Sequence, residues 1–172
     1  LQDLRSKIAD FNPAISTVSI AAQHAPVFST FPDMALRANH VFPSLKFRLQ
    51  ADNLRDCVTM FLRGDTHMLL CYESKNAGPL PFDASIRRGL WGIDYLVPVV
   101  GGRLRYALKD SGEIAPATPA IVYPDNSYFG EVLNAGERLF GTRNHSKDPV
   151  CETAFSSGMK ELTLKGIGVG WL

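Results

Sequence analysis

Long apolar runs and a strong imbalance of charge are both missing from this sequence of 172 residues. Without a run long enough to cross a bilayer, we expect no membrane association. The net charge of +1 provides no strong basic field, so we do not expect this segment itself to bind nucleic acid. The first ten residues, LQDLRSKIAD, lack the basic-then-apolar layout of a signal peptide, which argues against export.

Cysteine is scarce. Cys57, Cys71 and Cys151 are an odd number at wide spacing, and they match neither a disulfide framework nor a zinc pattern. We therefore expect a reducing, cytoplasmic setting, with no metal and no cofactor. Cys57 and Cys71 lie within apolar segments, which predicts buried, unreactive thiols. Cys151 lies on a predicted strand and could be either buried or reactive.

Catalytic motifs are also absent. We find no Gly-rich phosphate loop, nucleophile elbow or carboxylate pair, so we predict no catalytic residue and no enzymatic activity. His24 has no nucleophile or orienting acid beside it in the sequence, as catalysis would require. It could serve as a pH sensor or simply line a pocket.

The sequence does contain a clear alternating pattern between Thr17 and Glu73. Apolar or alternating runs at 17–22, 45–49 and 68–72 predict strands, and segments of helical period at 27–42 and 54–62 predict helices. A β-α-β-α-β order implies a parallel sheet, with space for a ligand at the carboxyl ends of its strands. The first such end lies at Gln23 and His24.

A change of composition follows. Residues 74–88 are rich in turn formers and predict a crossing into a second lobe. In that lobe we predict strands at 91–100, 120–123 and 150–155, and a helix after Asp125-Asn126-Ser127. Residues 103–108 could pair with the first of these strands or be irregular. We expect the chain to return to the first lobe at Ser156, with a last helix and a strand at 167–172. Two such crossings make a hinged cleft.

The resulting division has three parts. Residues 1–13, with apolar positions at helical spacing, form the end of an amphipathic helix or a frayed terminal helix. Residues 14–73 and 156–172 form subdomain I, and residues 74–155 form subdomain II.

Two stretches carry a family resemblance. The segment HAPVFSTFPDMALRANHVFPSLKFRLQADNLRDCVTMFLRGDTHMLLCY and the closing GIGVGWL resemble the effector-binding domain of LysR-type transcriptional regulators. The resemblance covers essentially the whole chain. PDNSYFGEVLN and Phe155-Ser156-Ser157 are most similar to the subgroup of the hypochlorite-responsive regulator.

The resemblance implies an α/β fold of the periplasmic-binding-protein-like type 2 class. It has two α/β subdomains, a hinged cleft, and parallel sheets with one antiparallel strand each. It also implies a winged helix-turn-helix domain upstream that binds DNA, a linker helix ending within residues 1–13, and a homodimer or homotetramer. Two departures stand out. Residues 159–166 are about one helical turn short, and the family continues beyond Leu172 with a strand and a helix that complete subdomain I. Residues could be missing at either place.

The family's effector pocket lies between the lobes. The matching positions here are Gln23, His24, Ala25, Asn53, Tyr72, Asn126, Ser127, Tyr128, Ser156 and Ser157. Helix N-termini present unpaired N–H groups and partial positive charge, which suit an anionic or polar small-molecule effector. Alternatively, Asn53, Asn126, Ser127 and Ser156 are only N-caps, each worth about 1 kcal/mol.

Oxidation is a second possible signal if the subgroup resemblance holds. Met34, Met60, Met68, Met159 and Cys151 are the candidate redox-sensing residues, because sulfoxidation makes an apolar side chain polar. The helical or strand spacing of the methionines favours core packing instead. The leading functional interpretation is the sensing and oligomerisation module of a transcriptional regulator. The alternative is a free-standing solute-binding protein for transport, which would need a signal peptide.

Overall fold

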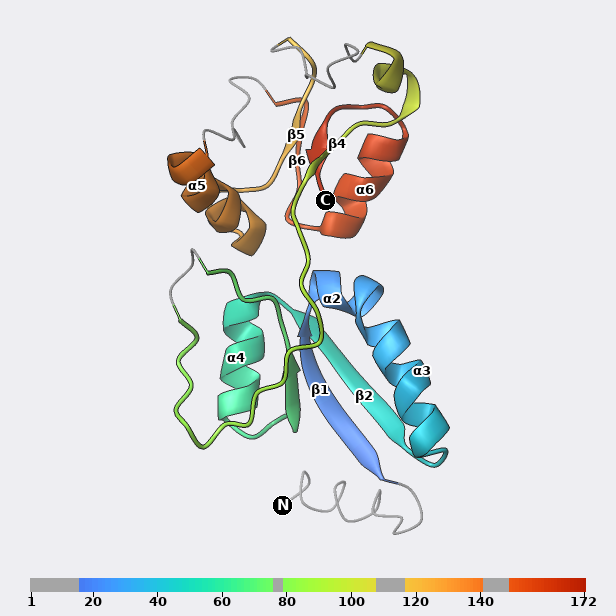
Figure 1. Cartoon of the computed structure of the whole chain (residues 1–172), viewed down its shortest axis with the longest axis vertical. Coiled ribbons are helices and arrows are strands. Elements are labelled where there is room, and N and C mark those ends of the chain that lie inside the picture. The colour runs from blue at the N-terminus through green and yellow to red at the C-terminus, as the bar shows by residue number, and fades with distance from the viewer. Residues whose placement is uncertain (1–15, 76–78, 108–116, 141–148) are drawn as a thin grey trace, which may run out of the picture. The chain divides into compact units, whose positions relative to one another are not determined.

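The computed structural model describes residues 16–75, 79–107, 117–140 and 149–172 (Figure 1). The chain divides into two compact units, Leu1–Tyr72 and Glu73–Leu172. The first boundary agrees with the crossing expected near Glu73. The predicted end of a linker helix, residues 1–13, lies outside the described residues.

The first unit is built on a parallel sheet of three strands in the order β2-β1-β3. The strands are β1 (Thr17–Gln23), β2 (Lys46–Asp52) and β3 (Met68–Leu70). The near-continuous apolar run of β1 takes the central place, since a central strand is covered on both faces; Ile20, Ala21 and Ala22 are fully buried. Polar and apolar residues alternate along β2, which lies at an edge. The predicted β-α-β-α-β order is confirmed.

Helices cover both faces of this sheet (Figure 1). The connection from β1 to β2 contains α2 (His24–Ser29) and α3 (Phe31–Val41), and the connection from β2 to β3 contains α4 (Leu54–Leu62). The first crossover runs from the central strand β1 to β2, and the second runs in the opposite direction, from β2 past β1 to β3. Right-handed connections therefore place their helices on opposite faces of the sheet.

The single helix predicted over 27–42 is in fact two. The helix starts earlier, at His24, and breaks at Thr30. Pro32 explains the break: it has no N–H to donate to the carbonyl four residues earlier, but it fits the first turn of a new helix. The helix predicted over 54–62 is confirmed as α4. Asn53 is its N-cap, and Gly64 follows it at a φ of 77°. Leu62, at its last position, is 53% exposed.

The second unit contains β4 (Pro98–Val99), β5 (Ile121–Val122), β6 (Cys151–Glu152) and β7 (Gly170–Trp171). β4 pairs antiparallel with β7, and β5 pairs parallel with β6. A parallel bridge between Ala120 and Val169 joins the two pairs. This unit therefore has the one antiparallel strand that was expected, whereas the described strands of the first unit are all parallel.

The described residues of the second unit also form the 3-10 helix η1 (Gly102–Ala107) and the helices α5 (Tyr128–Phe140) and α6 (Ser156–Leu164). Its buried core consists of Ile121, Tyr123, Leu133 and Met159. The long strand predicted over 91–100 is wrong for most of its length. Only the segment beside β7 forms a ladder, in which Val97 and Leu172 exchange two hydrogen bonds of 2.9 Å.

The predicted return to subdomain I at Ser156 is also wrong. α6 and β7 belong to the second unit. Met159 of α6 is fully buried in the second core, and Val169 exchanges backbone hydrogen bonds of 2.8 Å with Pro119 and Ile121. The closing GIGVGWL segment therefore completes the second sheet. At Gly170 a Cβ atom would lie 2.5 Å from the Met159 sulfur, so this glycine permits close packing.

Candidate functional site

The predicted site residues of the first unit gather at one edge of its sheet. β1 ends at Gln23, which is in register with Asp52 at the end of β2. Asn53 follows β2 directly, and Tyr72 follows β3 by two residues. The carboxyl ends of parallel strands share one edge, and ligands of α/β proteins bind there. The structure thus brings Gln23, Asn53 and Tyr72 to this edge.

Gln23 anchors a small polar network at this edge. Its side chain is only 5% exposed, and its Oε1 accepts a hydrogen bond of 2.6 Å from the backbone N–H of Tyr72. The Tyr72 hydroxyl lies 3.2 Å from Ser29 Oγ on α2, and Ser29 Oγ also donates to the carbonyl of Ala25 at 3.2 Å. The network therefore joins the ends of β1 and β3 to α2.

The sequence analysis did not predict Ser29 as a site residue. Its spacing of four residues from Ala25 was the available signal, because it places both on one side of a helix. His24 and Ala25 are half-buried first residues of α2. The Gln23 side chain makes no capping bond to α2, because it bonds across the sheet instead.

Asn53 acts as an N-cap of α4. Its Oδ1 accepts a hydrogen bond of 3.0 Å from the backbone N–H of Asp56, and its amide nitrogen donates to the carboxylates of Asp52 and Asp56. Capping of α4 therefore explains the presence of Asn53 at this position without a ligand. Two carboxylates beside this helix start would repel an anion, which argues against an anionic ligand group here.

The second unit holds the other predicted positions. Ser127 is also a cap: its Oγ accepts from the backbone N–H of Gly130 at 3.2 Å and donates to the carbonyl of Pro124 at 2.7 Å. Asn126 is exposed. Tyr128 is the first residue of α5, and its ring meets that of Phe129 edge-on at 5.4 Å.

Ser156 and Ser157 are the first two residues of α6 and not its caps. The N-cap residue is Phe155, and no side chain caps this helix. The N-cap alternative is therefore wrong for Ser156. Because β5 and β6 are parallel neighbours, the segments that lead to α5 and α6 leave the same edge of the second sheet. The ten predicted residues thus form two groups, one at the carboxyl edge of each sheet. That the two groups form a single pocket stays a prediction.

The candidate redox residues differ in exposure. Met159 is fully buried, Met34, Met60 and Cys151 are half-buried, and Met68 is 45% exposed. Cys57 is fully buried, as predicted, and its burial is the main cause that raises the pKa of its thiol to about 11. Cys71 is only half-buried.

Two further features were not anticipated. His67 Nδ1 lies 2.8 Å from Ser19 Oγ and accepts the Ser19 backbone N–H at 3.0 Å, which ties the start of β3 to β1. The described residues contain no group of three or more potential metal-ligating side chains.

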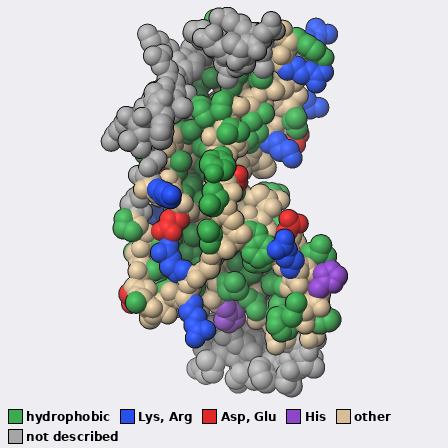
Figure 2. All heavy atoms as spheres, in the orientation of Figure 1, with side chains coloured by type: hydrophobic (Ala, Val, Ile, Leu, Met, Phe, Trp, Pro, Cys, Tyr) green, Lys and Arg blue, Asp and Glu red, His purple; other side chains and the backbone are tan. Residues whose placement is uncertain are grey.

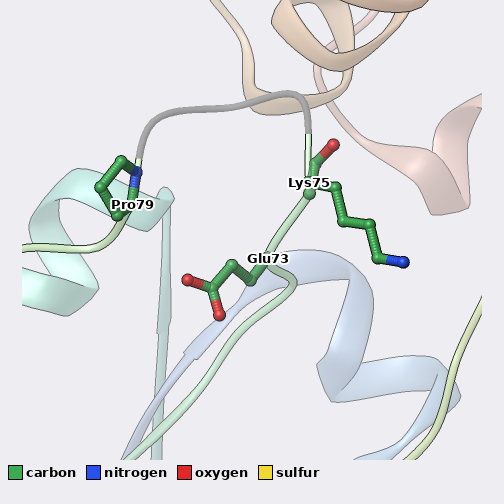
Figure 3. A pocket seen from close by; sticks show the side chains of 4 residues that line it. Glu73, Lys75 and Pro79 are labelled. Atoms are coloured by element: carbon green, nitrogen blue, oxygen red, sulfur yellow. The ribbon is translucent and has the colours of Figure 1, made fainter.

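The second feature is a hollow of about 380 Å³ after Tyr72, lined by Glu73, Ser74, Lys75 and Pro79 (Figure 3). Glu73 accepts a hydrogen bond from Arg88, which lowers the pKa of its carboxyl group. In Figure 3 the labelled Glu73 and Lys75 side chains point away from each other. None of the predicted effector residues lines this hollow.

Comparison with known proteins gives a consistent result at the level of fold. No family model matches the chain, and no curated protein matches it. Among solved structures, the apo regulatory domain of HypT from Salmonella typhimurium matches at a TM-score of 0.65 and 21% identity, over 95% of this chain and 72% of that one. A LysR family transcriptional regulator matches at 0.71 and 20% identity, over 99% of this chain and 57% of that one.

A third match is the effector-binding domain of QuiR in complex with shikimate, at a TM-score of 0.66 and 13% identity, over 92% of this chain and 73% of that one. Shared structure at such low identity defines a fold. The chain has the periplasmic-binding-protein-like type 2 fold found in the regulatory domains of LysR-family regulators. Among the described residues, no helix is long and apolar enough to span a membrane.

Proposed function

We propose that this chain is the effector-sensing and oligomerising part of a LysR-type DNA-binding transcriptional regulator. The observation that carries the proposal is the network of Gln23, Tyr72 and Ser29 at the carboxyl edge of a sheet in this fold. QuiR binds shikimate and HypT was also solved with bromide, so small polar or anionic ligands occur in this fold.

The charges of the site restrict how such a ligand binds. Asp52 and Asp56 flank the start of α4, so an anionic group binds elsewhere. α6 has no acidic residue in its first turn and no side-chain cap, so its first N–H groups suit an anion near Ser156 and Ser157. The Tyr72 hydroxyl and Gln23 amide suit the ligand's neutral polar groups.

DNA binding is assigned to a winged helix-turn-helix domain that is not part of this chain. The charge of the surface agrees with this assignment. Net charge is +1, and on the face drawn in Figure 2 the Lys and Arg side chains are dispersed among hydrophobic ones. A protein that acts on DNA in this way belongs in the cytoplasm, and we propose no catalytic activity for it.

The partner of the first unit is a second copy of the chain. Leu36, Val41 and Phe42, in and just after α3, are each at least 60% exposed, together with Phe28 of α2. Burial of these side chains in a homodimer or homotetramer would remove them from water. Sedimentation of the chain over a range of concentrations tests this, and a monomer at every concentration would contradict it.

Ligand binding is tested by thermal melting of the chain with a panel of small carboxylic acids. A ligand that binds only the folded state raises the melting temperature. Gln23→Glu keeps an oxygen acceptor for the Tyr72 N–H but adds a negative charge, so we expect it to weaken binding of a stabilising acid. Gln50→Glu, at an exposed position of β2, is the matched control. Equal binding by both variants, or no response to any acid, would remove the basis of the proposed site.

A further inference from the structure

The start of η1 lies against the C-terminal end of α6 (Figure 1). Glycines make this contact possible. A Cβ atom at Gly102 would lie 2.8 Å from the backbone nitrogen of Gly166, and one at Gly101 would lie 2.5 Å from the carbonyl oxygen of Thr163. Because the two backbones touch, the residues that flank the contact belong to one surface. Both segments are part of the second unit, so this surface does not depend on the first unit.

Cationic side chains flank the contact. The backbone nitrogen of Arg103 lies 3.3 Å from the Cβ position of Gly166, and Lys165 directly precedes Gly166. Arg103, Arg105 and Lys165 are all exposed. Among the residues that the structure describes, Arg103 and Lys165 form no ion pair, and this includes Glu161, one turn before Lys165 on α6. A group of unpaired charges of one sign attracts groups of the opposite sign.

The end of α6 does not require these cations as caps. The backbone N–H groups of Gly166 and Ile167 donate to the carbonyls of Thr163 and Leu162, at 2.9 and 3.1 Å. With a φ of 76° at Gly166, these two bonds form a Schellman motif, which satisfies the last carbonyls of a helix. The charged groups beside the motif are therefore available to a partner.

Apolar side chains border the same cations. Leu164 and Ile167, at the end of α6, are 56% and 46% exposed. Tyr106 of η1 is 75% exposed, and the Arg105 guanidinium lies 4.7 Å from the centroid of its ring. Arg and Tyr are enriched among the residues that contribute most to binding at protein interfaces. Stacking of Arg105 on Tyr106 holds both side chains in one arrangement, which lowers the entropy lost on binding.

We propose that this surface binds an acidic segment of a partner protein that also carries apolar side chains. The η1–α6 surface consists of Arg103, Arg105, Tyr106, Leu164, Lys165 and Ile167. Carboxylates of the partner pair with the cations, and its apolar groups cover the exposed leucine and isoleucine. Nucleic acid matches the surface less well. Three cations neutralise few phosphates, and exposed aliphatic side chains gain nothing from a phosphate backbone.

Such a partner is additional to the small-molecule effector of the proposed function, and its binding does not rest on that effector. Fluorescence anisotropy of labelled probes, added to the full chain, tests the proposal. The first probe is a short synthetic peptide in which Glu and Leu alternate. The second has Lys in place of Glu, and the third is a DNA duplex. We expect the Glu–Leu peptide to bind, with an affinity that falls as salt is added, and the Lys–Leu peptide not to bind.

Charge reversal locates the binding surface. Arg103→Glu and Lys165→Glu should each weaken binding of the Glu–Leu peptide about tenfold, because each replaces an attraction by a repulsion. Arg63→Glu makes the same change of charge at an exposed position just after α4, and it should leave the affinity unchanged. Thermal melting checks that each variant folds. If Arg103→Glu impairs folding, Arg103→Gln removes the charge alone and should still weaken binding about threefold.

Three results would overturn the proposal. The first is that the Glu–Leu peptide does not bind. The second is that Arg63→Glu weakens its binding as much as Arg103→Glu and Lys165→Glu do. The third is that the chain binds the DNA duplex, or vesicles of phosphatidylserine, in preference to the peptide. None of these results changes the response of melting to small acids, so the proposed effector site is judged separately.

Discussion

Gln23, the last residue of β1, accepts a hydrogen bond of 2.6 Å from the backbone N–H of Tyr72, which lies just beyond β3. The bond is between residues 49 positions apart. It fixes the direction in which the chain leaves the first unit, and it holds the Tyr72 hydroxyl beside Ser29. A side chain at the sheet edge thus determines the shape of the candidate site.

Removal of this bond should destabilise the protein. Gln23→Ala leaves the Tyr72 N–H without its acceptor, and we expect a loss of about 1–3 kcal/mol in the free energy of unfolding. Gln50→Ala, at an exposed position on β2, should change it by no more than about 0.5 kcal/mol. Urea denaturation of the two variants measures the difference. Equal stabilities would show that the hydrogen bond is not significant in solution.

Asn53 should matter for stability and not for ligand binding. Asn53→Ala removes the acceptor for the Asp56 N–H and should cost about 1 kcal/mol. Asn53→Ser retains a capping oxygen and should recover most of that loss. The affinity for any stabilising acid, measured by calorimetry, should be the same in both variants. A selective loss of affinity in Asn53→Ala would make Asn53 a ligand contact after all.

The packing of β7 on α6 gives a sharp test of the second core. In Gly170→Ala the new methyl group would lie 2.5 Å from the Met159 sulfur and 2.6 Å from Thr163 Oγ1. We expect a cost of about 1–3 kcal/mol in unfolding free energy, because a close-packed core must shift to admit it. At Gly92 a Cβ would meet nothing within 4 Å, so Gly92→Ala is the control. If both substitutions have the same effect, β7 does not pack against α6 in this way.

Alkaline pH should weaken the first unit through Cys57. Its pKa in the folded chain is raised from its ordinary 9.0 to about 11, mainly by burial. The unfolded chain therefore loses this proton first, and stability falls as the pH rises from about 9 to 11. The difference in pKa corresponds to about 3 kcal/mol that is present below pH 9, and about 2 kcal/mol of it is lost by pH 11.

Other groups titrate in the same range, so the test compares two proteins. Denaturation of the original chain and of Cys57→Ala is measured at pH 8 and pH 11. The variant lacks the thiol and should lose about 2 kcal/mol less between the two pH values. An identical loss in both proteins would mean that Cys57 ionises freely in the folded state.

Much of the first unit could be predicted from the sequence, because its signals are local. The apolar run of β1, the alternation along β2 and the Asn53 cap of α4 each depend on residues within one or two turns or one strand. The α2–α3 break also had a local cause in Pro32, but the helical periodicity across it concealed the break. The predicted site residues of both units were placed correctly at strand ends, because the end of a predicted strand is also a local signal.

The tertiary structure decided what depends on partners distant in sequence. Residues 91–97 have the composition of a strand, but a ladder needs a second chain segment, and β7 meets only its end. Burial of Met159 between β5 and α5 residues put α6 in the second unit, although the pattern of α6 fits either lobe. Cys57 and Cys71 appeared to be two unrelated core residues in the sequence. The tertiary structure separated them: Cys57 on α4 is fully buried, whereas Cys71, just beyond β3, is only half-buried, because local spacing contains no information about how far distant segments cover a residue.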